Sequence, residues 1–500
     1  MSALFDAIAT GAHTALSPTN LIYCFGGVTL GTLIGILPGL GPIATISMLL
    51  PVTFYLPPET ALITLAGIYY GAQYGGSTTA VLVNMPGESS SVVTCLDGYA
   101  MARQGKAGPA LSIAAIASFF AGCVATLVIA SFAPVLANFA LEFGPAEYFA
   151  LMLLGLVAAV VLASGSLVNA FAMIFLGLLF GTVGTDLNTG VERFTFGIPK
   201  LVDGVDFVTM SMGIFAISEI VVNLESVQER TILKEKIGRL LPSAEDFKRS
   251  IWPIVRGTGL GSMLGILPGG GAVLSSFASY AVEKRIAKEP GRFGKGAIEG
   301  VAGPEAANNA GAQTSFIPLL TLGIPSNPVM ALMIGAMMIQ GITPGPQIMT
   351  AKPDLFWGVI VSMWAGNLML VILNLPMIGI WIQLLKVPYR LLYPTILLLC
   401  VIGVYSVNNA TFDLVILSVF GVMGYVFVKI GCEPAPLLLG FILGPLLEEY
   451  FRRALIMSHG DLSVFVRNPI SGTIIAMAAV LLLIVVLPSI RKKREEAFQE

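Results

Sequence analysis

Apolar residues fill most of this chain in long runs, and short polar stretches separate one run from the next. In the first half the runs cover residues 20–37, 42–56, 60–86, 108–141, 146–164, 166–184 and 207–223. In the second half they cover residues 252–267, 272–282, 300–325, 354–384, 388–407, 411–431, 434–447 and 469–490. A helix needs about 20 apolar residues to cross the hydrocarbon core of a bilayer. The pattern therefore predicts an all-α polytopic membrane protein.

Two pairs of these runs are short, and a nearly identical phrase joins the runs of each pair. Residues 31–42 read GTLIGILPGLGP and residues 261–272 read GSMLGILPGGGA; the window 27–42 matches 257–272 at nine of sixteen positions. Proline lacks a backbone donor and glycine readily adopts positive φ, so neither phrase continues as one regular helix. Each pair predicts either two thin spans or one re-entrant hairpin with its Pro-Gly tip inside the membrane. Interrupted segments at corresponding places in two halves point to a transporter binding site.

Short matches beyond the two phrases extend the duplication. They occur in the same order, at offsets of 240, 239 and 236 residues: Gly71-Ala72-Gln73 with Gly311-Ala312-Gln313, Asn84-Met85-Pro86 with Gly323-Ile324-Pro325, and Ala100-Met101-x-x-Gln104-Gly105 with Ala336-Met337-x-x-Gln340-Gly341. These matches predict a first repeat over residues 1–230 and a second over residues 231–490, followed by a basic tail over residues 491–500.

The basic residues indicate how the two short pairs are oriented. The flanks of the second pair carry seven Lys or Arg in residues 224–256 and five in residues 283–299, whereas the flanks of the first pair, 1–19 and 57–60, carry none. Because Lys and Arg accumulate on the cytoplasmic side of membranes, the first hairpin is predicted to enter from the periplasm and the second from the cytoplasm. That arrangement is an inverted repeat, with a periplasmic N-terminus and a cytoplasmic C-terminus.

Counting the crossings from this start predicts about eleven transmembrane helices plus the two hairpins. Five basic residues disagree with the charge rule, because the count leaves them outside: Arg193, Lys200, Arg452, Arg453 and Arg467. Residues 185–206 and 448–468 are therefore predicted either as periplasmic loops or as segments that lie on the membrane surface.

Composition narrows the function. Of the 500 residues, 56% are hydrophobic and 11% are charged, compared with roughly 25% charged residues in soluble proteins. The five cysteines lie far apart and only His13 and His459 are present, which argues against a metal cluster, a zinc site or a resident cofactor. The apolar core also lacks a lysine for a Ser-Lys hydrolase, so we expect no enzyme activity.

The run after each short pair is unusually polar and rich in glycine. Residues 69–91 read YYGAQYGGSTTAVLVNMPGESSS, and residues 303–328 read GPEAANNAGAQTSFIPLLTLGIPSNP. Gly75-Gly76 and Asn308-Asn309 are interpreted as breaks in the middle of a membrane crossing, since irregular backbone at that depth is tolerated where it lines a cavity. The alternative is that the small residues let two helices approach closely.

The candidate site residues belong to the two Pro-Gly tips and to these two polar stretches. The candidate substrate-binding residues are Pro38, Gly39, Leu40, Gly41, Pro42, Gly75, Gly76, Ser77, Thr78, Pro268, Gly269, Gly270, Gly271, Asn309, Gln313, Thr314 and Ser315. The candidate cation-coupling residues are Asn84, Glu88, Asn308, Ser326 and Asn327. No Lys or Arg lies in these segments, so an anionic group would be held by free N–H groups at helix N-termini near Pro42 and Ala272.

Three further acidic residues have a less definite place in this pattern. Glu305 adjoins the second expected break, where it would take up a proton or a cation; the alternative is a helix-end carboxylate that faces water. Glu219 and Asp413 lie in or beside apolar runs. An acid within the membrane is a functional hypothesis by default, but both could sit near the interface, and neither is assigned a role.

Taken together, GILPGLGP, YGAQYGGS with NMPGE, GILPGGG and the long 303–328 phrase resemble the large membrane subunit of the tripartite tricarboxylate transporters. The resemblance implies a secondary transporter in the bacterial inner membrane that imports tricarboxylates such as citrate or related dicarboxylates. It implies two partners, a small integral membrane subunit and a periplasmic solute-binding protein, and coupling to sodium ions or protons. The ligands of such an ion are not identified, nucleic acid is not expected as a partner, and a dimer is left open.

Two opposed hairpins also resemble elevator-type carriers, in which a bundle carrying both tips moves against a scaffold. Here the scaffold would be the long runs 108–141 and 354–384. The alternative functions are a passive channel and a scaffold subunit without a transport path of its own. Flux that saturates and follows an ion gradient separates a transporter from a channel, and any flux at all separates it from a scaffold.

Overall fold

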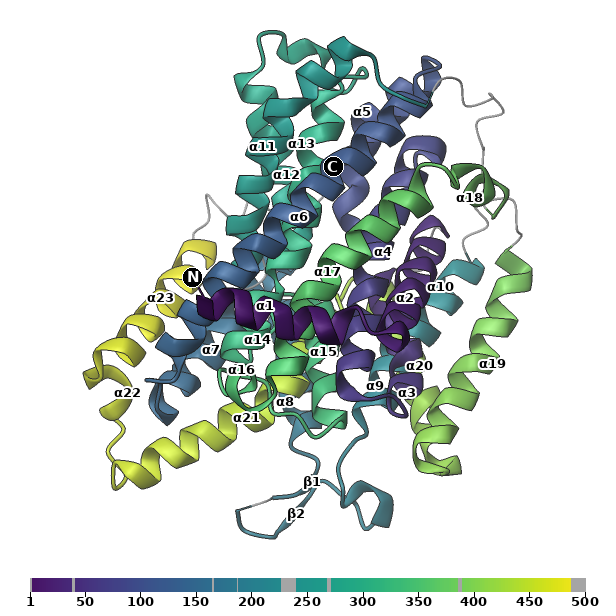
Figure 1. The fold of residues 1–500 in the computed structure, drawn as a ribbon. Coiled ribbons are helices and arrows are strands. Elements are labelled where there is room, and N and C mark those ends of the chain that lie inside the picture. The colour runs from purple at the N-terminus through teal and green to yellow at the C-terminus, as the bar shows by residue number, and fades with distance from the viewer. Residues whose placement is uncertain are drawn as a thin grey trace.

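A computed structural model describes residues 2–37, 41–163, 166–186, 188–225, 240–267, 271–384 and 389–486. These residues are helical almost throughout and include one two-stranded antiparallel sheet, in which Gly184 pairs with Arg193 (Figure 1). The expected all-α class is therefore confirmed for the described part of the chain.

Most elements of the first half follow the predicted runs, but the helices Ser2–Ala15 and Val92–Arg103 lie outside them. In chain order the elements are α1 (Ser2–Ala15), α2 (Pro18–Ile36), α3 (Pro42–Thr53), α4 (Pro58–Val83), the 3-10 helix η1 (Ser89–Ser91), α5 (Val92–Arg103), α6 (Ala107–Ala140), α7 (Pro145–Leu162), α8 (Leu167–Gly181), β1 (Gly184–Thr185), β2 (Glu192–Arg193), the 3-10 helix η2 (Pro199–Leu201), α9 (Phe207–Ser211), the π-helix η3 (Met212–Ile217) and α10 (Ser218–Glu225).

The second half repeats the order of a helix pair followed by a polar helix. Its elements are α11 (Ala244–Ile266), α12 (Gly271–Ile286), the 3-10 helix η4 (Pro290–Arg292), α13 (Glu299–Thr314), α14 (Phe316–Leu322), α15 (Pro328–Ile339), α16 (Ile348–Ala351), α17 (Pro353–Asn374), α18 (Ile378–Leu384), α19 (Tyr389–Asn408), α20 (Thr411–Lys429), α21 (Ala435–Met457), α22 (Val464–Arg467) and α23 (Pro469–Val486).

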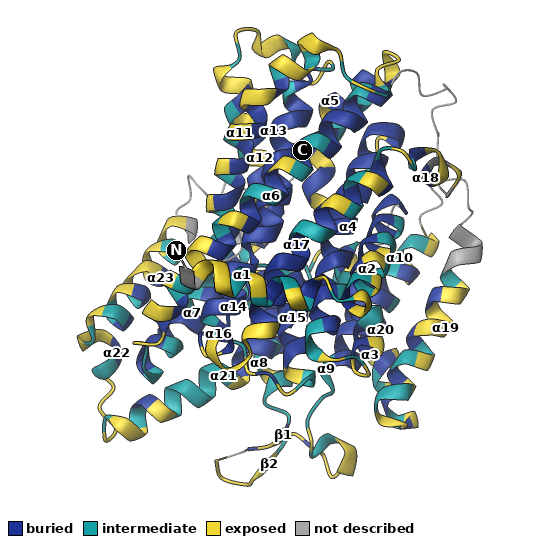
Figure 2. Ribbon diagram, in the orientation of Figure 1, coloured by how far each residue is buried: buried dark blue, intermediate teal, exposed yellow. Residues whose placement is uncertain are grey.

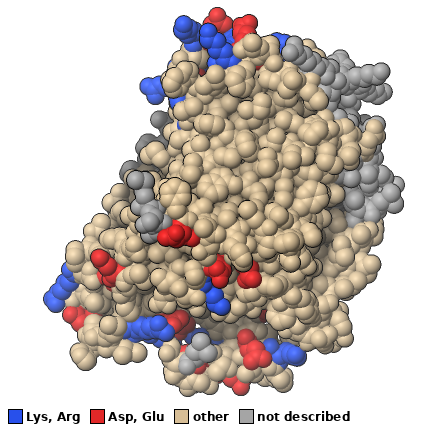
Figure 3. All heavy atoms as spheres, in the orientation of Figure 1, with Lys and Arg blue, Asp and Glu red and all other residues tan. Residues whose placement is uncertain are grey.

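Five helices in the described ranges are long and apolar enough to cross a membrane: Pro18–Ile36, Ala107–Ala140, Phe207–Glu225, Pro353–Asn374 and Thr411–Lys429. Several other apolar helices are shorter, so the count of about eleven spans stays a prediction. Figure 3 shows a broad uncharged surface between a charged upper end and the charged groups of the lower part. In Figure 2 the buried residues concentrate in the middle of the bundle, while α19 and α23 at the margins carry many exposed residues.

The expected breaks inside the polar helices are wrong in position. Helix α4 continues through Gly75-Gly76 and ends at Asn84, whose backbone is left-handed with φ 58. Helix α13 likewise continues through Asn308-Asn309. A glycine here serves close helix packing rather than a bend in the backbone. A Cβ on Gly75 would lie within 3.0 Å of the backbone oxygen of Thr32 on the neighbouring helix.

One scaffold run also differs from its prediction. The expected continuous segment 354–384 divides into α17 and α18, and Pro376 lies in the turn between them. Proline removes a helical hydrogen bond and clashes with the preceding turn, which explains the division.

Close backbone packing joins the first arm of each helix pair to the polar helix that follows. A Cβ added to any of six glycines would lie within 3.0 Å of a carbonyl oxygen on the neighbouring helix. In the contact of α2 with α4 the pairs are Gly27 with Thr64, Gly31 with Ile68 and Gly35 with Ala72. In the contact of α11 with α13 they are Gly257 with Gly303, Gly261 with Ala307 and Gly265 with Gly311. Only glycine permits this approach at these positions.

The same contacts give the register of the internal duplication. The partner carbonyls of the two halves are 239 residues apart, for example Thr64 and Gly303. Asn84 and Gly323 have the same separation, and both end a helix in the left-handed conformation, with φ 58 and φ 69. The Gly-Ala-Gln match at an offset of 240 is therefore one residue out of the packing register.

Two matched glutamines connect the halves to each other. Gln104, at the end of α5, donates from Nε2 to the carbonyl oxygen of Lys295 at 2.8 Å, in the segment after α12. Gln340, at the end of α15, donates from Nε2 to the carbonyl oxygen of Thr53 at 2.7 Å, at the end of α3. Each half therefore anchors the second arm of the other half's helix pair. Figure 1 places α5 and the α11–α13 end in the upper part of the molecule and α3 and α15 in the lower part.

The two stretches that disagree with the charge rule are folded against each other. Arg193 on β2 contacts Glu448 on α21 at 2.9 Å, and Arg452 contacts Asp186 at 3.1 Å. Arg452 also pairs with Glu448 at 2.5 Å along the helix. Asp186 and strand β2 are therefore held against α21 by ion pairs.

The glycine packing generates a stability prediction. The substitution Gly261→Ala places a Cβ against the Ala307 backbone and should destabilise the protein by roughly 1–3 kcal/mol, as overpacking does. Gly259 on the same helix has open space around its Cβ position, so Gly259→Ala is the matched control. Thermal unfolding of the purified protein in detergent measures both. Equal midpoints for the two variants would contradict the packing account.

Candidate functional site

One face of α4 carries three polar side chains at intervals of four residues, so that they lie one above another on the helix. Tyr69 Oη accepts from Asn327 Nδ2 at 3.5 Å, Gln73 Nε2 donates to Glu88 Oε2 at 2.9 Å, and Ser77 Oγ donates to Glu305 Oε2 at 2.6 Å. Two of the three partners belong to the second half. The face of α4 therefore connects polar residues from both halves of the chain.

Glu88 and Asn327 occupy corresponding places in the two halves. They are 239 residues apart, and both have extended backbone, with φ −150 and φ −156, directly before a helix. Asn327 caps α15 by accepting from the N–H of Met330 at 3.0 Å. Each residue follows a Pro-containing turn that the duplication predicts, so the two turns are structural counterparts.

Each of these turns lies beside the described end of one arm of its own helix pair. A Cβ on Gly87 would overlap the backbone of Gly35, near the end of α2. A Cβ on Gly271, at the start of α12, would lie 3.4 Å from Asn327 Nδ2. The helix after each turn also contacts the opposite pair, since η1 packs against α12 and α15 packs against α3. The two turns are thus held between the two helix pairs.

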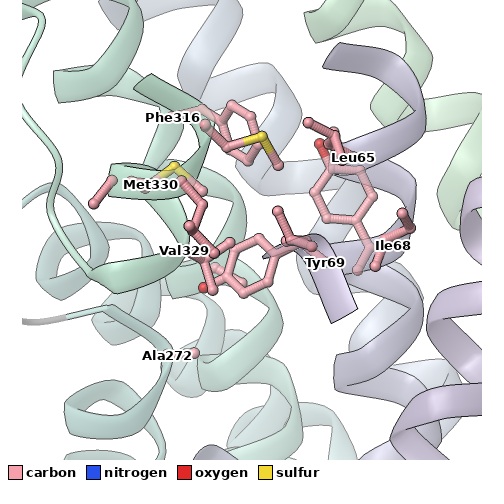
Figure 4. Close-up of a cluster of buried hydrophobic side chains, with 14 of the residues drawn as sticks. Leu65, Ile68, Tyr69, Ala272, Phe316, Val329 and Met330 are labelled. Atoms are coloured by element: carbon pink, nitrogen blue, oxygen red, sulfur yellow. The ribbon is translucent and has the colours of Figure 1, made fainter. Parts of the chain in front are cut away.

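Apolar side chains from several elements surround this region. Figure 4 shows Tyr69 of α4 close to Val329 of α15, with Ala272 of α12 nearby and Phe316 above them. Tyr69 and Val329 are each at least 96% buried. The Tyr69–Asn327 contact is part-buried, because Asn327 itself is only half-buried.

A second row of polar contacts joins α13 to α6. Asn309 Nδ2 donates to Ser118 Oγ at 2.7 Å, and Gln313 Oε1 accepts from Thr126 Oγ1 at 3.0 Å. All four residues are buried. Glu305 lies one turn before Asn309 on the same face of α13 and is 0% exposed, with Ser77 and Thr94 as hydroxyl partners.

A small cavity adjoins Glu305. It has about 10 Å³ of space, and its lining includes Tyr74, Ser77 and Thr78 of α4, Ser118 of α6 and Asn374 of α17. The Tyr74 hydroxyl and Asn374 Oδ1 are buried and lack a hydrogen-bond partner in the described structure. Buried polar atoms are normally satisfied, so these two atoms mark the cavity as a place for a small polar species.

The structure brings together several of the predicted site residues and separates others. Ser77, Thr78 and Asn309 lie at or next to the cavity, and Gln313 continues that polar row. Asn308 Oδ1 accepts from Asn309 Nδ2 at 2.5 Å.

Ser315, Ser326 and Asn327 form a second group at the turn. Ser326 Oγ donates to the Ser315 carbonyl at 3.3 Å, and Asn327 Nδ2 donates to Ser315 Oγ at 3.1 Å. Gly76 lies beside the corresponding turn of the first half, where a Cβ would meet Glu88 Cγ at 3.0 Å.

Three predicted residues have a packing or surface position instead. Gly75 lies against α2, and the hydroxyl of Thr314 bonds to the Ala310 carbonyl within its own helix at 2.9 Å. Asn84 is exposed at the end of α4. For Gly75 the alternative of close helix packing was therefore the better reading.

The first tip has an internal partner. Glu219 Oε1 accepts from the N–H of Gly41 at 3.1 Å, at the start of α3, and Pro42 is the first residue of that helix. A carboxylate from the chain itself thus occupies a donor that was expected to face the substrate. The remaining tip residues lie outside the described residues: Pro38, Gly39, Leu40, Pro268, Gly269 and Gly270.

Glu219 also lines a larger cavity of about 340 Å³ between η3, α3 and the start of α21. This volume is in the range of small-molecule pockets. Its charged lining residues are both acidic, Glu219 and Glu433, which disfavours an anionic ligand there.

We use the term polar centre for the polar contacts of α4, α6 and α13 together with the cavity beside Glu305. Several of its residues were not identified from the sequence. The interval of four between Tyr69, Gln73 and Ser77 would have predicted that they share one face of a helix. Ser118 and Thr126 are spaced by eight on one face of α6 and could have been found in the same way. Thr94 and Asn374 could not be found in this way, because only the folded chain brings them to Glu305 and the cavity.

These features define a helical membrane protein with two matching halves and a buried polar centre to which both halves contribute. The chain belongs to the tripartite tricarboxylate transporter TctA family, whose model matches residues 21–439. The family expected from the sequence motifs is therefore confirmed. The protein is a membrane component of a tripartite tricarboxylate transport system, and its family is one of transporters rather than enzymes.

Two curated proteins of Agrobacterium vitis are similar to the chain. One, described as an uncharacterized 52.8 kDa protein in the TAR-I ttuC' 3' region, is 58% identical over 500 residues and covers 100% of both chains. The other, from the TAR-II ttuC' 3' region, is 62% identical over 240 residues, which is 48% of this chain and 99% of that protein. No solved structure matches the chain.

Proposed function

We propose that the protein is the transport subunit of a secondary active importer for tricarboxylates such as citrate or related dicarboxylates. It acts with a small integral membrane subunit and a periplasmic solute-binding protein in the bacterial inner membrane, and a sodium or proton gradient drives it. The observation that carries this proposal is the pair of equivalent turns at Glu88 and Asn327, which lie beside the two helix-pair tips and meet on one face of α4.

The two halves act as inverted repeats, residues 1–230 and 231–490, whose helix pairs are re-entrant hairpins. The common 239-residue register and the reciprocal Gln104 and Gln340 contacts support this assignment. The unequal distribution of basic residues supports a periplasmic entry for the first hairpin and a cytoplasmic entry for the second.

The substrate carboxylates bind between the tips and the two turns. Gly41 and Gly271 begin helices there, and N–H groups at helix starts suit anions when no Lys or Arg is nearby. Because Glu219 already accepts from Gly41, a carboxylate that uses the first tip must displace this side chain. Ser315, Ser326 and Asn327 supply neutral hydrogen-bonding groups at the second tip.

Transport follows an elevator-type movement of the hairpin-bearing helices against α6 and α17. The contacts that support a boundary there include α17 with α2 and α4, and α6 with α13. A small residue lines part of it, since Gly366 of α17 lies against Cys24 of α2. The two scaffold helices also contact each other closely, where Gly122 of α6 lies against Asn367 of α17. A passive channel would need no such boundary, and a scaffold subunit would need no buried polar centre.

Uptake into liposomes tests the function. The chain, reconstituted with the small membrane subunit and the binding protein, should accumulate labelled citrate in a saturable manner when a sodium or proton gradient is imposed. Omitting the binding protein or collapsing both gradients should reduce the uptake to background. Saturable accumulation without either gradient, or linear flux, would contradict an ion-driven carrier.

A disulfide clamp tests the moving boundary. In a chain whose other four cysteines are replaced, Gly366→Cys should cross-link to native Cys24, since a Cβ at position 366 would lie 3.6 Å from Cys24 Sγ. Oxidation should abolish citrate uptake, leave citrate binding intact and be reversed by a reductant. The control is the same variant with Cys24→Ser, which oxidation should not affect. Normal uptake by the fully cross-linked protein would show that α2 and α17 do not move relative to each other.

A further inference from the structure

We propose that Glu305 and the oxygen atoms of the adjoining cavity bind one sodium ion, and that this ion connects the hairpin-bearing helices to α6 and α17. The inference rests on the proposed function for the role of the ion in transport. The existence of the site follows from local features of α4, α6, α13 and α17, and it can be tested without transport.

The charge of Glu305 calls for a counter-charge. Its side chain is 0% exposed, and its partners are neutral groups that include the hydroxyls of Ser77 and Thr94. Among the described residues no Lys or Arg forms an ion pair with it. Burying an ionised carboxylate without an opposite charge costs several kcal/mol even after relaxation. A bound cation, or a proton, removes that cost.

The polar lining of the cavity consists of oxygen atoms. Asn374 directs its amide nitrogen to the Leu370 carbonyl at 2.9 Å, which leaves Oδ1 as the atom without a partner. The other polar contributors are the hydroxyls of Tyr74, Ser77, Thr78 and Ser118, together with the Glu305 carboxylate. Hard cations prefer oxygen ligands, whereas an anion would be repelled by the ionised Glu305 carboxylate in the same lining.

The size of the cavity excludes the organic substrate. A space of about 10 Å³ is roughly enough for a single water-sized particle. A tricarboxylate has many more atoms than this space can hold. The site is therefore distinct from the substrate region at the two turns, although Ser77 and Gln73 on α4 connect the two regions.

The cavity lining contains one carboxylate, and this charge matches a monovalent ion better than a divalent one. Glu305 supplies one negative charge, and the other lining side chains are neutral. Protein sites for divalent cations usually include more than one carboxylate, and the described residues contain no group of three or more acidic, His or Cys side chains placed for a metal. One carboxylate with neutral oxygens balances a single positive charge.

The position of the site gives the ion a mechanical role. Its ligands come from α4 and α13, which pack against the first arms of the two helix pairs, and from α6 and α17, the proposed scaffold. Separation of these helices would remove Ser118 and Asn374 from the ion. Sodium therefore stabilises the arrangement described here and must leave or move with Glu305 when the boundary shifts.

Binding of radioactive sodium to the purified full chain in detergent, without substrate, tests the site. The parent protein should bind sodium saturably, and Glu305→Gln should weaken the affinity at least about tenfold, because the only charged ligand is lost. Ser77→Ala and Asn374→Ala should each weaken it several-fold and carry the test if the glutamine variant does not fold. Glu147→Gln is the matched control: Glu147 is a buried acid that caps α7 through the Gly144 N–H, and its loss should leave sodium affinity unchanged.

Three outcomes separate the possibilities. Saturable binding that is lost in the site variants and kept in Glu147→Gln supports the sodium site. Unchanged affinity in Glu305→Gln, or no saturable binding by a parent protein that still binds citrate, overturns it and assigns the cavity to a water molecule beside a protonated Glu305. Intact sodium binding with no citrate uptake in liposomes would contradict the proposed function and leave the sodium site standing.

Discussion

The structure depends on how closely α2 approaches α4 and α11 approaches α13. In a membrane the hydrophobic effect does not drive helices together, so van der Waals packing and interhelical hydrogen bonds must do so. Glycines at intervals of four bring the backbones into contact, as Gly31 does with Ile68 and Gly261 with Ala307. Because the glycine-lined faces of α4 and α13 are occupied in this way, their polar side chains are directed to other neighbours. The row Tyr69, Gln73 and Ser77 and the row Glu305, Asn309 and Gln313 are the consequence.

The polar centre requires both halves. Ser77 of the first half binds Glu305 of the second, and Asn327 of the second half lies against Tyr69 of the first. The reciprocal anchors at Gln104 and Gln340 hold these partners in register. A duplicated chain folded as two separate units would leave Glu305 without its hydroxyl partners, and such a buried carboxylate is destabilising. The interlocking of the halves and the buried charge therefore support each other.

Much of the fold was predictable from the sequence, because apolar runs and glycine-proline phrases report directly on helices and their ends. Most helices lie within a few residues of the predicted runs, and the Asn84–Gly323 correspondence was visible before the fold was known. The expected break at Gly75-Gly76 was wrong because a glycine can either permit a bend in a helix or permit close packing of two helices. The sequence does not show which applies, since that depends on the helix that lies against the glycine. Residues such as Thr94, Asn374 and Glu219 were not predictable as partners, since their contacts join segments far apart in the sequence.

The central claim is that the two helix pairs enter the membrane from opposite faces around this shared centre. Single cysteines in an otherwise cysteine-free chain, labelled in intact cells with a membrane-impermeant maleimide, test it most directly. Tyr55, between α3 and α4, is 66% exposed, and Gly291, after α12, has open space around its Cβ position. The account predicts that Tyr55→Cys reacts from outside and that Gly291→Cys reacts only after the inner membrane is permeabilised. Labelling of both cysteines from the same side would contradict it.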